Sequence, residues 1–129
     1  MIKIISLLVI LLFITGMMYA QNQKSVPGKL LRHVVLFKFK ESATPDDILK
    51  VEEAFKDLPD IIHGIKGFEW GTNVSPENLN DGFTHCFMVS FATAKDRDAY
   101  LPHPAHQAFV SLLKPYLDKA LVVDYWAEH

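Results

Sequence analysis

Two segments that lie far apart in this chain of 129 residues constrain its fold most, because in each of them every second residue, with one exception, is apolar. In residues 31–40 every odd position is apolar except His33, and in residues 83–91 every odd position is apolar except His85. Successive side chains of a strand point to opposite faces, so both segments are predicted to be strands with one buried face. Each strand therefore places one histidine on an otherwise apolar face.

Helices are predicted between these strands. Thr44 followed by Pro45 is typical of a helix start, because the hydroxyl caps the first turn and proline suits its first position. We expect this helix to end at Pro59, since proline disrupts a helix interior. The order strand, helix, strand, strand, helices, strand predicts an α+β fold: a ferredoxin-like split β-α-β arrangement with a four-stranded antiparallel sheet and its helices on one face. The remaining expected elements are strands at 68–74 and 121–126 and helices at 95–101 and 105–114.

The sheet face that points away from the helices is predicted to be too apolar to remain in water. A second copy of the chain would cover it, so we expect a homodimer through the sheet face. Cys86 is the only cysteine, and no disulfide within the chain is expected. The face would carry Val34, Leu36, Cys86 and Met88.

The first 20 residues are predicted to be a secretory signal peptide. Lys3 is their only charge, an apolar run follows, and Ala20 supplies a small residue before a polar segment. An uncleaved membrane anchor is the alternative, although the apolar run is short for a bilayer span. We therefore expect an exported protein, periplasmic or secreted, that has no membrane contact after cleavage. Residues 21–30 would form a flexible leader and residues 31–129 a single domain.

The charge balance argues against a nucleic-acid partner. The whole chain carries a formal net charge of −2, and removal of Lys3 with the signal peptide makes it −3. No stripe of basic residues is available to neutralise phosphates.

The segment from Tyr100 to His106 packs two of the six histidines, a phenol and two prolines into seven residues. Pro104 can open a new helix, where its missing N–H costs nothing. From His106, helical spacing leads to Phe109 and Leu113, which places the imidazole on the face that should be buried. A titratable group on an apolar stripe needs a partner.

Roughly residues 31 to 127 resemble the stress-responsive dimeric A/B barrel (Dabb) domain family. The resemblance rests on several short motifs rather than one. It implies that two ferredoxin-like chains pack sheet against sheet as a homodimer, which is a dimeric α/β barrel. The matching residues are His33 to Phe39, Trp70-Gly71, Gly82 to His85, Tyr100 with His103-Pro104-Ala105-His106, and Val123-Asp124-Tyr125.

The resemblance also implies a catalytic site, by analogy with a plant polyketide cyclase of the family. His106 would be the general base, Asp124 would hold its tautomer, and Tyr100 would donate to a substrate carbonyl. Glu52 departs from that cyclase's pocket residues, which argues against a long-chain substrate. The expected substrate-binding residues are His33, His85, Phe37, Phe55, Phe87 and Val89.

Two functions remain open from the sequence. One is a small-ligand-binding or stress-associated module without chemistry, in which a His106–Asp124 hydrogen bond is only structural. The other is an acid-base enzyme of the lyase or cyclase kind that acts on a small apolar carbonyl compound without a cofactor. Three imidazoles suit zinc or iron. We nevertheless predict no metal, because only His103 and His106 are close in sequence and just one of them should face inward.

Overall fold

The computed structural model describes residues 28–128, so the expected signal peptide and residues 21–27 of the leader lie outside the described part. The described residues form four strands, β1 (Leu31–Phe39), β2 (Ile65–Thr72), β3 (His85–Phe91) and β4 (Leu117–Trp126). They also form three helices, α2 (Pro45–Ile61), α3 (Ala94–Tyr100) and α4 (Pro104–Leu113). No helix among them has the length and apolar character needed to cross a membrane.

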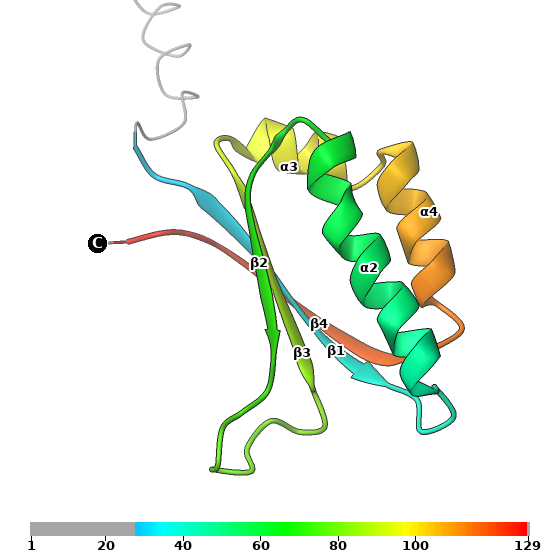
Figure 1. Cartoon of the computed structure of the whole chain (residues 1–129). Helices are drawn as coiled ribbons and strands as arrows, with labels where there is room; N and C mark the ends of the chain where they lie inside the picture. The colour runs from blue at the N-terminus through cyan, green and yellow to red at the C-terminus, as the bar shows by residue number, and fades with distance from the viewer. Residues whose placement is uncertain (1–27, 129) are drawn as a thin grey trace, which may run out of the picture.

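The strands form one antiparallel sheet in the order β2-β3-β1-β4. Helices α2 and α4 lie on one side of this sheet, and α3 lies near one end of it (Figure 1). This arrangement is the ferredoxin-like α+β fold, as the order of elements predicted.

The core lies between the sheet and the two longer helices, on the odd face of β1 and β3. Phe37, Phe55 and Phe87 are all buried there. The rings of Phe55 and Phe87 stack with their centroids 4.3 Å apart, which joins α2 to β3. The alternation predicted for both strands is therefore confirmed, and it fixes which side chains face the helices.

Helix α2 starts as predicted but ends later. The Thr44 hydroxyl accepts from the Asp47 N–H at 3.2 Å, and Asp47 Oδ2 accepts from the Thr44 N–H at 3.0 Å, which forms a capping box. Pro59 was expected to end the helix, but the helix continues to Ile61. Pro59 lies in the last turn, where its missing N–H removes a single bond, and Ile62 N–H still donates to the Leu58 carbonyl at 2.8 Å.

Several strand boundaries differ from the expected ones, and β1 ends at Phe39, one residue before the expected end. β2 runs from Ile65 to Thr72 instead of 68–74, β3 begins two residues late at His85, and β4 begins four residues early at Leu117. β4 is longer because it pairs with β1 along its whole length, as far as Phe39 opposite Leu117. The loop between β2 and β3 extends beyond the end of the sheet (Figure 1).

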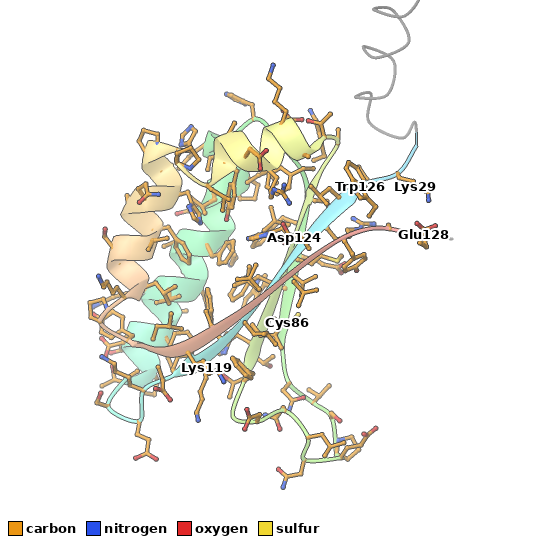
Figure 2. All side chains as sticks on the ribbon, turned by 180° about the vertical axis from the view of Figure 1, so that it is seen from behind. Lys29, Cys86, Lys119, Asp124, Trp126 and Glu128 are labelled. Atoms are coloured by element: carbon orange, nitrogen blue, oxygen red, sulfur yellow. The ribbon has the colours of Figure 1, made fainter. Side chains whose placement is uncertain are left out.

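The sheet face that carries the even-numbered residues of β1 and β3 is apolar, and no element among the described residues covers it. We call it the even face. In the register, Val34 of β1 lies opposite Met88 of β3 and Val123 of β4, so all three side chains share this face. Val123 is 50% exposed. Lys29 and Glu128 form an ion pair beside the start of β1 and the end of β4 (Figure 2). The apolar area thus spans three strands, including β4, which the sequence prediction had not assigned to it.

Candidate functional site

A cleft of about 530 Å³ lies between the β1–β4 side of the sheet and the helices α3 and α4. Most of its lining is apolar, and its polar residues touch one another as a cluster. We call this group the polar cluster; it comprises His33 of β1, Arg97 and Tyr100 of α3, His106 of α4 and Asp124 of β4. An apolar cleft with a few convergent polar groups is the usual form of a small-molecule site.

Strand pairing brings the first two members of the polar cluster together. His33 lies directly opposite Asp124 in the β1–β4 register, and residues in that relation share a face. The Nδ1–H of His33 donates to Asp124 Oδ1 at 2.6 Å. The two side chains are 7% and 23% exposed. In Figure 2, Asp124 is seen on β4 below α3.

Helix α3 contributes Arg97, which holds the other oxygen of the same carboxylate. Its Nη1 donates to Asp124 Oδ2 at 2.8 Å, and its Nε donates to Asp98 Oδ1 at 3.0 Å. The bond to Asp124 is the main reason why the pKa of Arg97 is raised above its usual value. Both oxygens of Asp124 therefore have partners, and its orientation is fixed from two elements.

The junction between α3 and α4 positions His106. The ring of His103 caps α4, where its Nδ1 accepts from the Ala105 N–H at 3.0 Å. The Nδ1–H of His106 donates to the Leu101 carbonyl at 2.9 Å. Because a carbonyl can only accept, Nδ1 carries the proton, and Nε2 of the neutral ring is an acceptor.

The environment of His106 keeps its ring neutral. Burial is the main cause that lowers its pKa, and the charges of His33 and His103 lower it further. The hydrogen bond to Leu101 acts in the opposite direction without reversing the shift. Since the ordinary value is 6.5, His106 is unprotonated at pH 7 and its Nε2 can accept a proton.

Tyr100 contacts the rings of His33 and His106, and its hydroxyl has no hydrogen-bond partner among the described residues. Its ring centroid is 4.3 Å from that of His106 and 5.8 Å from that of His33. Burial raises the pKa of Tyr100, so the group stays a hydroxyl with a proton to donate. A buried donor without an acceptor is costly, and a ligand oxygen in the cleft would satisfy it.

The predicted catalytic residues His106, Tyr100 and Asp124 all line this cleft, but the partner that we expected for His106 is wrong. Asp124 bonds His33 and Arg97, while His106 bonds the Leu101 carbonyl. The reason is the strand register, which sets His33 opposite the aspartate and leaves the helix histidine nearer to its own preceding turn.

The expected substrate-binding residues divide into two groups. His33, Phe37 and Phe55 line the cleft, whereas His85, Phe87 and Val89 are not among its lining residues. Phe87 and Val89 are fully buried in the core, so they support the cleft without facing it.

His85 is held in a separate polar contact. Its Nε2 bonds Glu52 Oε1 at 2.9 Å, its Nδ1 bonds Thr84 Oγ1 at 2.8 Å, and it lines a smaller cavity of about 240 Å³. Its ring stacks on that of Trp70. The pocket role expected for His85 in the main cleft is therefore wrong. The other side chains on its face of β3 are apolar, and Glu52 of α2 supplies the hydrogen-bond partner that the ring needs.

Sequence reasoning missed Arg97 as a site residue. It lies three residues before Tyr100, and that spacing puts both side chains on the same side of α3. This spacing was the sequence signal that could have identified Arg97 as a site residue. The described residues contain no group of three or more His, Cys, Asp or Glu side chains placed to hold a metal ion.

Comparisons with known proteins agree on one family. The sequence model of the stress responsive A/B barrel domain matches residues 31–127. A stress-response A/B barrel domain-containing protein, HS1 of Arabidopsis thaliana, is 38% identical over 95 residues, which are 74% of this chain and 87% of that protein. Olivetolic acid cyclase of Cannabis sativa is 30% identical over 95 residues, or 74% of this chain and 94% of the cyclase.

Solved structures share the fold. A hydroxynitrile lyase from Passiflora edulis superposes with a TM-score of 0.74 at 26% identity, over 79% of this chain and 96% of the lyase. A protein of unknown function from Thermobifida fusca, described as dimeric and ferredoxin-like, superposes with a TM-score of 0.68 at 25% identity. That match covers 78% of this chain and 93% of the other.

Proposed function

This chain belongs to the stress-responsive A/B barrel family, and from that premise we propose that its cleft binds a small, mostly apolar carbonyl compound and catalyses proton transfer on it. One observation carries the proposal. Tyr100 has a buried hydroxyl with no partner among the described residues, and it lies against His106, a neutral imidazole whose Nε2 is an acceptor. A proton donor and a proton acceptor are thus carried by two neighbouring side chains that line an apolar cleft.

The two groups have complementary tasks in such a reaction. His106 Nε2 takes a proton from the carbon beside the carbonyl, and the electron pair moves onto the carbonyl oxygen. The Tyr100 hydroxyl donates to that oxygen as it gains negative charge. His106 then returns its proton to the same carbon or to another atom of the substrate. Side chains alone therefore complete the cycle.

Two relatives support acid-base chemistry by their names, one a cyclase and one a lyase. We extend that chemistry to this chain because residues of the right type converge in its cleft. The apolar lining, which includes Phe37 and Phe109, suits a ligand with an aromatic or aliphatic body.

A binding module without chemistry is the second candidate. The observation that favours it is that the Tyr100 hydroxyl is covered in the free chain. A ligand would reach this hydroxyl only if neighbouring side chains shift. A module that holds a ligand by its apolar body alone would not need that movement.

Deuterium incorporation into phenylacetone separates the two candidates, because loss of an α-proton leads directly to exchange with D2O. Wild-type protein should accelerate exchange above buffer, and His106→Gln should slow the protein-dependent rate about 10²-fold. Tyr100→Phe should also slow it, whereas His63→Gln, a change at an exposed histidine, should not. Binding of phenylacetone without exchange would identify a module, and the absence of both would refute the proposal.

We also propose that the protein is a homodimer through the even face of the sheet. The apolar area around Val34, Val123 and Met88 supports this arrangement, since isolated chains rarely leave such a surface in water. The description of a structural neighbour as dimeric supports it further.

A further inference from the structure

The role proposed for His106 does not explain the hydrogen bonding of the His33 ring. Its Nδ1–H is committed to a carboxylate at 2.6 Å, and no described residue bonds its Nε2. The ring lines the cleft beside Tyr100. An imidazole held by a carboxylate on one nitrogen and open on the other is the usual arrangement of a histidine that transfers protons.

The groups that face His33 come from three elements. Asp124 of β4 bonds it, Tyr100 and Arg97 of α3 lie on the helix side, and His106 of α4 lies beyond Tyr100. Among them Asp124 accepts from Nδ1 and so fixes the tautomer that leaves Nε2 as an acceptor. His33 can therefore accept a proton at Nε2 when neutral and return one when charged.

Arg97 fixes the orientation of Asp124. Its Nη1 holds Asp124 Oδ2, so the carboxylate that orients His33 cannot rotate away. Because a carboxylate only accepts, the proton of the hydrogen bond between His33 and Asp124 lies on His33 Nδ1.

On the basis of the proton-transfer function proposed above, we propose that His33 is a second catalytic residue of the cleft and that Arg97 is a positioning residue that acts on it through Asp124. The reaction would then use two imidazoles whose rings both contact the ring of Tyr100. His106 Nε2 takes the proton from carbon, and the electron pair moves to the carbonyl oxygen. His33 takes a proton from solvent at Nε2 and gives that proton to the substrate, and His106 returns its own proton to solvent.

This arrangement selects a class of substrate. The polar cluster and Asp98 together hold one guanidinium against two carboxylates, so no unpaired cation faces the ligand among these residues. Arg97 is already paired with both carboxylates, so an anionic ligand would gain no ion pair with its guanidinium. The cleft therefore favours neutral carbonyl compounds, and phenylacetone should bind while phenylacetate, of similar size, should not.

Nitrogen NMR of histidine labelled with ¹⁵N tests the geometry without any ligand. The spectrum of neutral His33 should show the tautomer with hydrogen on Nδ1, and Asp124→Asn should remove that preference. His106 should keep its own Nδ1–H tautomer in the same variant, because the Leu101 carbonyl holds it. A His33 ring that carries hydrogen on Nε2 in the wild type would overturn the inference.

Exchange of phenylacetone protons tests the role. His33→Gln should slow exchange about 10²-fold. Arg97→Gln should slow it about tenfold through misplacement of His33, and Arg97→Lys should recover part of the loss. In a His33→Gln background, Arg97→Gln should have no further effect, because coupled residues are not additive.

The outcomes separate this inference from the function on which it rests. If His106→Gln abolishes exchange while His33→Gln leaves it unchanged, the inference is wrong and the proposed function stands. If wild-type protein neither binds phenylacetone nor exchanges its protons, the proposed function fails and the inference fails with it. His63→Gln is the matched control in every arm.

Discussion

At the scale of single residues, His106 should make the protein sensitive to acid. Its folded pKa lies below the ordinary value of 6.5, mainly because of burial, so protonation favours the unfolded chain. The stability that depends on neutral His106 is therefore present above pH 6.5 and is lost as pH falls through the folded pKa. Urea unfolding at neutral and acidic pH should show a smaller acid loss for His106→Gln than for wild type. An equal loss in both proteins would contradict this assignment.

Tyr100 should contribute more to function than to stability. Its hydroxyl is buried without a described partner, so Tyr100→Phe removes an unsatisfied donor and should leave the free energy of unfolding unchanged or raise it by about 1 kcal/mol. Phenylacetone exchange should fall in the same variant. His63→Gln, at an exposed histidine, is the control and should change neither quantity. A marked loss of stability in Tyr100→Phe would show that the hydroxyl has a structural partner.

The residues of the cleft were only partly predictable from the sequence. The spacing from Tyr100 to His106 and the helical stripe through Phe109 were local signals, and the structure places the two polar side chains side by side. The partner of Asp124 depends on strand register, which joins residues 91 positions apart. No local pattern contains that information, and this is why His106 was paired with the wrong group.

At the scale of elements, the capping box should account for a measurable part of the stability of α2. Thr44→Ala removes the hydroxyl that accepts from Asp47 N–H, and such losses cost about 1 kcal/mol. Chemical denaturation of the two proteins measures the difference. Ser111→Ala, at an exposed position inside α4, should change stability little and controls for loss of a hydroxyl. Equal effects of the two substitutions would rule out the cap as the cause.

Element types were predictable, but some boundaries were not. Thr44-Pro45 located the start of α2 because its signals are local, and the hydroxyl and proline act within one turn. The end of α2 was misjudged because Pro59 removes one hydrogen bond while the apolar contacts of Phe55 and Leu58 hold the last turns on the sheet. β4 was underestimated because its first residues pair with β1, a contact that the sequence does not display.

At the scale of the whole molecule, the even face of the sheet should control assembly. Val123→Glu places a charge on the β4 side of this face and should convert a dimer into a monomer, as measured by light scattering after gel filtration. Leu49→Glu on α2 is a matched control, since Leu49 is 52% exposed and Val123 is 50% exposed. A wild-type protein that is monomeric, or a dimer that survives Val123→Glu, would contradict the proposed interface.

The fold as a whole was predictable because each strand and helix has a pattern of its own, and their order admits few topologies. The bare apolar face was predicted from β1 and β3, and β4 enlarges it. Export rests on residues 1–20, which lie outside the described residues, and it remains a prediction.

A crystal structure of the protein with phenylacetone tests the central claim most directly. The ketone should occupy the cleft with its oxygen within hydrogen-bond distance of the Tyr100 hydroxyl and its α-carbon next to His106 Nε2. Its ring should lie among the apolar residues near Phe109. A ketone bound elsewhere, or bound in the cleft with its oxygen away from Tyr100, would contradict the account.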